Sequence, residues 1–111
     1  MTLAEYRRDM FIINKENRCR RQVGQLDIIK TDIRQAMNGN EFALKVNWNY
    51  YINYLYANDI NSNWKTLAKL NVLYNTKEYL ALLFAIKDLQ KEYRERANRQ
   101  RKILLKIKEA N

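Results

Sequence analysis

The side chains that most often carry out catalysis or bind metals are scarce in this chain of 111 residues. Histidine, the commonest general base and metal ligand, is absent, and the single cysteine, Cys19, cannot build a thiolate metal site alone. Glu5 and Asp9 are one helical turn apart, but the neighbouring Arg7 and Arg8 favour surface ion pairs over a shared cation. We therefore expect no enzymatic activity, no cofactor and no metal site.

Basic side chains give the strongest functional signal. Lysine and arginine outnumber aspartate and glutamate by 21 to 12, and they are unevenly placed. One cluster runs from Arg7 to Arg21 and a second from Lys87 to Lys108, whereas Lys45 is the only basic residue between Gln35 and Trp64. Such segregation favours binding to a polyanion over a merely solvated surface.

The second cluster forms a stripe when it is placed on a helical wheel. Most of its basic residues share one side, and Asp88, Glu92 and Glu95 fall on the neighbouring flank, so the stripe is free of acid. Pairs four residues apart, such as Glu92 with Arg96, are also typical of an ordinary solvated helix, and that alternative stays open. The candidate nucleic-acid-binding residues are Lys87, Lys91, Arg94, Arg101 and Lys102 in the stripe, with Arg7, Arg8, Arg18, Arg20 and Arg21 in the first cluster.

Two apolar regions are candidate protein interfaces. The stretch "ILLKI", residues 103–107, continues the apolar seam of the last helix beyond the expected bundle, where an uncovered apolar patch usually marks a protein contact. A second apolar face lies within the aromatic residues 46–56, opposite their expected core side. The alternative is that both regions are ordinary core. The candidate interface residues are Tyr50, Tyr54, Ile103, Leu104 and Ile107, and self-association through the C-terminal helix is one expected use.

The aromatic stretch "VNWNYYINYLY", residues 46–56, fits two secondary structures. Its apolar residues alternate with asparagines, as in a strand, but Trp48, Tyr51, Ile52 and Leu55 also share one face of a helix. Nothing else in the chain alternates, so a strand would lack a partner, and we favour the helix while keeping both. Base stacking needs interleaved basic residues, which are nearly absent here, so we favour a core role.

The chain as a whole is predicted to be all-α, because it has no proline and only Gly24 and Gly39 to interrupt helices. We expect a single domain, residues 1–111, folded as a three- to four-helix bundle with a long, protruding C-terminal helix. A capping box of Thr2 and Glu5 begins the first helix. The expected helices cover residues 3–37, with a bend near 14–22 where the apolar face changes sides, and then 41–58, 62–74 and 76–109.

Location in the cell is indicated by two weaker features. A lone cysteine fits a reducing interior, and the N-terminal "MTLAEYRRDM" lacks the apolar run of a signal peptide. The longest apolar run, "YLALLFAI", is far shorter than the roughly 20 residues needed to cross a bilayer. We expect a cytoplasmic protein with no membrane partner.

These features together predict a non-enzymatic, basic, helical accessory subunit. It would bind the backbone of DNA or RNA without sequence specificity, within a larger nucleoprotein assembly or a homo-oligomer. The alternative is a helical protein–protein adaptor or inhibitor, encoded by a phage or mobile element, that docks on an acidic protein surface.

Overall fold

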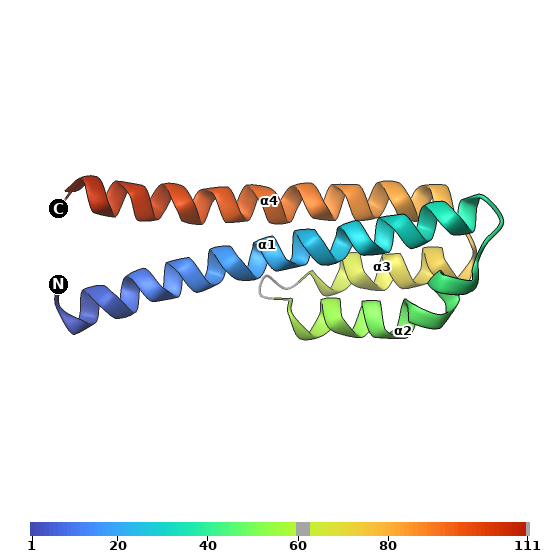
Figure 1. Ribbon diagram of the computed structural model, residues 1–111, viewed down its shortest axis with the longest axis horizontal. Helices are drawn as coiled ribbons and strands as arrows, with labels where there is room; N and C mark the ends of the chain where they lie inside the picture. Colours follow the sequence, from blue (N-terminus) through green and yellow to red (C-terminus); the bar gives the residue numbers. More distant parts are fainter. Residues whose placement is uncertain (60–62, 111) are drawn as a thin grey trace.

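The computed structural model describes residues 1–59 and 63–110, and in this part of the chain all the regular structure is helical (Figure 1). The helices are α1 (Leu3–Met37), α2 (Phe42–Ala57), α3 (Trp64–Asn75) and α4 (Tyr79–Ala110). The expected all-α bundle with a long C-terminal helix is therefore confirmed, and residues 46–56 are helical. Residue 62, the expected start of the third helix, lies outside the described residues.

The four helices form an up-down-up-down bundle in which each packs beside the next and α4 returns to pack along α1 (Figure 1). The connections at 38–41 and 76–78 are too short for anything but antiparallel neighbours. α1 and α4 have 35 and 32 residues, whereas α2 and α3 have 16 and 12. The molecule is therefore elongated, 55 × 21 × 20 Å.

This difference in helix length divides the molecule into two ends. Residues 3–18 of α1 and 98–110 of α4 belong to the end of the molecule that extends past the α2–α3 hairpin, where α1 and α4 lie beside each other (Figure 1). We name these residues the two-helix arm, and the remaining described residues the four-helix end. The expected protrusion exists, but it consists of two helices and not of α4 alone.

The two short connections, at 38–41 and 76–78, each contain a residue in the left-handed conformation that ends the preceding helix. At the end of α1, Gly39 has a φ of 95° and the Asn40 N–H donates to the Gln35 carbonyl at 2.8 Å. At the end of α3, Lys77 takes the same role with a φ of 56°, and the Glu78 N–H donates to the Leu73 carbonyl at 3.0 Å. Because Lys77 cannot enter a helix in this conformation, α4 begins at Tyr79 and not at residue 76.

α1 is unbroken from end to end, and Figure 1 shows no sharp kink near residues 14–22, where the change of apolar face predicts a bend. Its fully or nearly buried positions Ile12, Cys19, Leu26 and Ile33 recur every seven residues, so one side of the helix lies against α4 throughout. Of the N-terminal apolar residues on another side of α1, Leu3 and Tyr6 are exposed, and Met10 and Ile13 are half-buried. At the start of α1, Thr2 Oγ1 accepts from the Glu5 N–H at 3.1 Å, as its capping role predicts.

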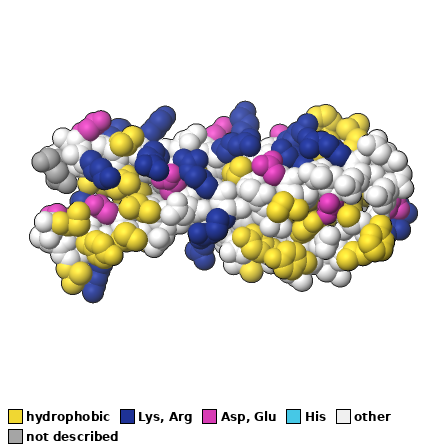
Figure 2. Space-filling model, viewed as in Figure 1, with side chains coloured by type: hydrophobic (Ala, Val, Ile, Leu, Met, Phe, Trp, Pro, Cys, Tyr) yellow, Lys and Arg dark blue, Asp and Glu magenta, His cyan; other side chains and the backbone are white. Residues whose placement is uncertain are grey.

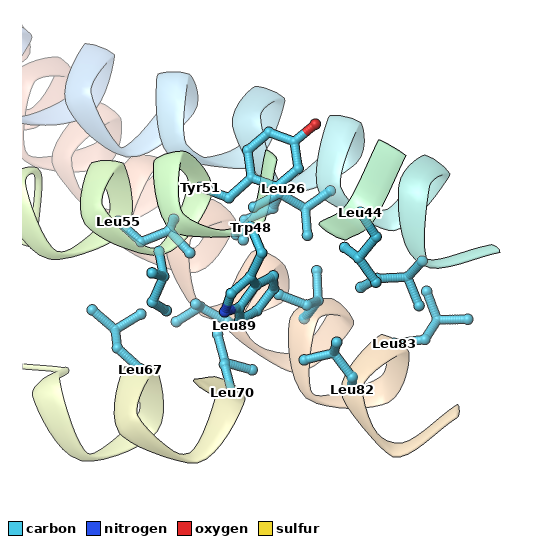
Figure 3. Close-up of a cluster of buried hydrophobic side chains, with 14 of the residues drawn as sticks. Leu26, Leu44, Trp48, Tyr51, Leu55, Leu67, Leu70, Leu82, Leu83 and Leu89 are labelled. Atoms are coloured by element: carbon cyan, nitrogen blue, oxygen red, sulfur yellow. The ribbon is translucent and has the colours of Figure 1, made fainter. Parts of the chain in front are cut away.

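The hydrophobic core fills the four-helix end (Figure 3). Trp48 lies at its centre, with its ring stacked on Tyr74 at a centroid distance of 4.4 Å and its Nε1 donating to Asn71 at 2.8 Å. The predicted core face of α2 is confirmed, because Trp48, Tyr51, Ile52 and Leu55 are all buried. Side chains from all four helices complete the core, among them Leu26, Ile29, Leu44, Leu67, Leu70, Leu82, Ile86, Leu89 and Tyr93.

The two-helix arm buries much less. Leu104 is only 3% exposed and Ile12 only 7%, because each lies on the side of its helix that faces the other. Leu104 was assigned above to an uncovered interface, and this assignment is corrected, since α1 covers it. Ile103 and Leu105 beside it remain about half exposed.

Candidate nucleic-acid interface

The two basic clusters lie side by side, although about seventy residues separate them in the sequence. α1 and α4 run antiparallel, so that Arg101 Nε lies 3.0 Å from Glu16 Oε1 and Arg20 Nη2 lies 3.4 Å from Asn98 Oδ1. Residues 1–37 and 79–111 together hold 17 lysines and arginines against nine acids, so they carry eight of the nine excess charges. Figure 2 shows Lys and Arg side chains spread along α4 and exposed hydrophobic side chains gathered over α2.

A buried glutamine fixes how α4 sits on α1. Gln90 donates from Nε2 to the Val23 carbonyl at 2.9 Å and to Asp27 Oδ1 at 2.6 Å, and its Oε1 accepts from Lys30 at 2.6 Å. The hydrogen bonds from Gln90 and Lys30 hold the pKa of Asp27 below its usual value. These bonds specify one register, and that register determines which basic side chains of the two helices become neighbours.

A buried carboxylate, that of Glu16, also holds α1 and α4 in one register, near the start of the two-helix arm. The Glu16 side chain is only 3% exposed. Its carboxylate forms ion pairs with Arg20 Nε, at 2.9 Å on the same helix, and with Arg101 of α4. Burial alone would raise the pKa of Glu16, but the hydrogen bonds from Arg20 and Arg101 outweigh it and lower the pKa. Two of the ten predicted binding residues therefore help to hold the helices together.

Most of the other predicted basic residues make no such contacts between the helices within the described part of the chain. All ten are exposed. Arg8 pairs with Asp9 at 3.2 Å on the surface of the arm. Within residues 1–59 and 63–110, no ion pair engages the remaining seven, which are Arg7, Arg18, Arg21, Lys87, Lys91, Arg94 and Lys102.

The seam between α1 and α4 contains a small hollow of about 220 Å³, here named the seam hollow. It is lined by Arg20, Val23, Arg94 and Asn98, so it joins one guanidinium from each basic cluster. Guanidinium groups bind phosphate oxygens through paired, charge-assisted hydrogen bonds. Two arginines at one hollow therefore favour an anionic ligand such as a phosphate group.

A second, larger groove of about 730 Å³ lies where the arm leaves the four-helix end. Its described lining comes from α1 and from the connection between α2 and α3. Gln22 Nε2 donates to the Asn58 carbonyl at 3.1 Å, which ties this connection to α1 beside the groove. We name it the notch groove, and it is lined by Phe11, Asn14, Lys15, Arg18, Arg21 and Asp59.

The predicted protein-interface residues are divided between the two ends. Tyr50 is 63% exposed and lies 6.3 Å from the half-buried Tyr54 ring, on the outer side of α2. Ile103 is exposed and Ile107 is half-buried in the arm. The structure does not bring these two pairs together, so they do not form one patch.

The described residues contain no cluster of three or more side chains able to hold a metal ion. Cys19 is fully buried, and this burial raises the pKa of its thiol. None of the helices has a stretch long and apolar enough to cross a membrane, within the residues that the structure describes.

Several residues of these sites were not predicted from the sequence, among them Phe11, Lys15 and Glu16. Phe11 and Lys15 gain their roles from the notch groove, whose far wall is a distant connection that the sequence does not locate. Glu16 carries a clearer signal, because it follows Ile12 by four residues and precedes Cys19 by three, in line with the core face. An acid at such a position predicts a basic partner from the neighbouring helix.

No protein-family model, no curated protein and no solved structure matches this chain.

Proposed function

We propose that this protein is a non-enzymatic accessory subunit that binds the phosphate backbone of nucleic acids without sequence specificity. The observation that carries the proposal is the seam hollow, because its lining joins Arg20 and Arg94, one arginine from each of the two basic clusters. Charge that merely keeps a protein soluble has no need for such convergence.

The extent of the basic surface fits a backbone. From Lys87 to Lys102, α4 rises about 22 Å, at 1.5 Å per residue. That length corresponds to about six nucleotides of a duplex strand at 3.4 Å each. Lysine and arginine on an exposed helix face contact phosphates but do not by themselves distinguish bases.

The test is the affinity for generic single-stranded DNA, duplex DNA and RNA, measured by fluorescence anisotropy across a salt series. Each phosphate neutralised should lower the logarithm of the affinity by about 0.9 per decade of salt on duplex DNA. A variant with Lys87, Lys91 and Arg94 changed to glutamate should lose binding, and it spares Arg101, which pairs with Glu16.

The matched control reverses Lys45, Lys65 and Lys69, which lie on α2 and α3 and make the same change in net charge. It should retain most of the affinity. Absence of binding by the wild-type protein at low salt would contradict the proposal, as would equal losses in the two variants.

A second candidate function is a protein–protein adaptor, and the exposed outer side of α2 favours it. Val46 and Tyr50 are exposed there, and Lys45 is the only charged residue of that helix. Tyrosine is enriched at the centres of protein interfaces. Purification from the native host followed by nuclease treatment separates the candidates, because an adaptor complex survives the nuclease and contains no nucleic acid.

A further inference from the structure

The notch groove combines an exposed aromatic ring with an excess of positive charge. Phe11, Lys15 and Arg18 follow one another at spacings of four and three residues, so they lie on the same side of α1. Arg21 continues this side towards the four-helix end, and Asp59 from the α2–α3 connection completes the lining. Among the described residues, three cations and one carboxylate therefore line the groove.

The Phe11 side chain is 68% exposed, whereas that of Ile12, the next residue of α1, is only 7% exposed. A single exposed apolar side chain on a flat surface needs no explanation. Phe11 differs because it lines a groove together with side chains that, among the described residues, are all polar or charged. Proteins that bind single-stranded nucleic acids combine aromatic rings, which stack on the bases, with basic side chains, which bind the phosphates.

The cations of the groove are available for a ligand. Lys15, Arg18 and Arg21 have no ion pair within the described part of the chain. The Asp59 carboxylate is occupied, since its Oδ2 accepts from the Asn63 N–H at 2.6 Å. The groove therefore keeps a positive balance next to the aromatic ring.

We infer that the notch groove binds an unpaired base of single-stranded nucleic acid. Phe11 stacks on the base, Lys15, Arg18 and Arg21 hold the phosphates on either side of it, and the Asn14 amide lies within the same groove to meet a base edge. This inference rests on the proposed function and specifies its substrate class. Bases of a duplex are stacked on their neighbours, so they cannot present a face to Phe11.

The aromatic residues of α2 do not meet the same conditions. Tyr50 is as exposed as Phe11, but Lys45 is the only basic residue on that helix. Stacking on Tyr50 would leave the adjoining phosphates without cations. The stacking platform is thus on α1, within the first basic cluster, and not in the tyrosine-rich stretch.

The experiment compares Phe11→Ala with Phe42→Ala, which removes an equally exposed ring from the start of α2. Both variants should fold, as far-ultraviolet circular dichroism will verify. Phe11→Ala should weaken binding to a single-stranded oligonucleotide by roughly 5- to 150-fold, the range for loss of one stacked base, and leave duplex binding unchanged. Phe42→Ala should change neither affinity.

An abasic oligonucleotide, which keeps the sugars and phosphates, provides the second arm. The wild-type protein should bind it as weakly as Phe11→Ala binds the normal strand, and Phe11→Ala should lose nothing further on it. A direct readout uses Phe11→Trp combined with Trp64→Phe, since stacking on a base should quench the new indole on addition of the normal strand and not of the abasic strand.

The outcomes separate the inference from the function on which it rests. Equal affinity of the wild-type protein for normal and abasic strands, with no effect of Phe11→Ala, overturns the base site and leaves backbone binding in place. Quenching of the indole by an acidic peptide, but not by any oligonucleotide, overturns it in favour of a protein ligand. Absence of all oligonucleotide binding overturns both proposals.

Discussion

The two ends of this molecule differ in how many sides of each helix are covered. In the four-helix end, every helix has two neighbours, and large side chains such as Leu70 and Ile86 are fully buried. In the two-helix arm, each helix has one neighbour and therefore buries one narrow face. Apolar side chains on the other faces of the arm remain exposed, among them Leu3, Tyr6, Phe11, Ile103 and Leu105.

The two ends therefore contribute differently to the stability of the fold. The four-helix end contains the hydrophobic core, whereas the arm contributes little to that core and leaves many apolar and basic side chains exposed. Regions with few buried apolar contacts open locally at low free-energy cost.

The largest effect is expected from a matched pair of cavities in α4. Leu89→Ala in the four-helix end should lower the free energy of unfolding by about 3–5 kcal/mol, because Leu89 is buried within the hydrophobic core. Leu104→Ala in the arm should cost about 2 kcal/mol or less, since one helix covers this residue and water can enter. Urea unfolding followed by circular dichroism measures both, and equal losses would abolish the distinction between the ends.

The next effect concerns the ion pairs at the root of the arm. Glu16→Gln should cost about 1–3 kcal/mol, because it weakens the buried hydrogen bonds to Arg20 and Arg101. The lowered pKa of Glu16 means that its contribution is present above pH 4.5, the ordinary value, and is lost as pH falls through the lowered one. The variant should therefore lose less stability on acidification than the wild-type protein; an identical acid dependence would show that Glu16 is not a source of it.

Alkaline pH should destabilise the four-helix end. Burial and the 2.5 Å hydrogen bond to Asp32 raise the pKa of Tyr51 to about 12, and burial together with Glu41 raises that of Tyr79 to about 12. Their contributions are present below pH 10 and decline as pH rises towards 12. Tyr51→Phe should cost about 1 kcal/mol at neutral pH and reduce this alkaline loss. Thermal melts at several pH values would test this, and an unchanged alkaline slope would contradict it.

The smallest effect is a gain in stability at the turn between α3 and α4. Lys77→Gly should raise the free energy of unfolding by about 0.5–1 kcal/mol, because glycine adopts the left-handed conformation without steric cost. Gly39→Ala is the mirror experiment, and it should lower stability by about 1 kcal/mol. A loss of stability in Lys77→Gly would mean that the lysine side chain, 3.5 Å from Glu41, matters more than the backbone.

Much of the fold was predictable because it depends on local rules. The absence of proline, the caps at Thr2 and Gly39, and the 3–4 spacing of apolar residues give the helices and the core side of α2. The start of α4 was not predictable, because a lysine in the left-handed region has no reliable sequence signature. The bounds of α1 were predicted, but the absence of a sharp bend was not, because Leu3 and Tyr6 looked like core residues and are exposed.

The candidate sites were predictable only in part. The exposed basic residues follow from the helical wheel, but their meeting in the seam hollow depends on the register set by Gln90 and Glu16. Register arises from tertiary packing, so single-helix patterns do not contain it. The notch groove depends further on the position of Asp59, which comes from a connection without a periodic pattern.

The seven-residue spacing of the buried positions in α1 has a geometrical consequence for the basic surface. α4 shows the same spacing at Leu83, Gln90, Ala97 and Leu104. A straight helix drifts by about 20° per heptad from such a repeat, so two helices that keep the seam closed must coil around each other in a left-handed sense. The outward charges of α4 turn with the coil and describe a slowly winding track. A flexible single strand follows such a track more readily than a stiff duplex, whose axis stays straight over this length.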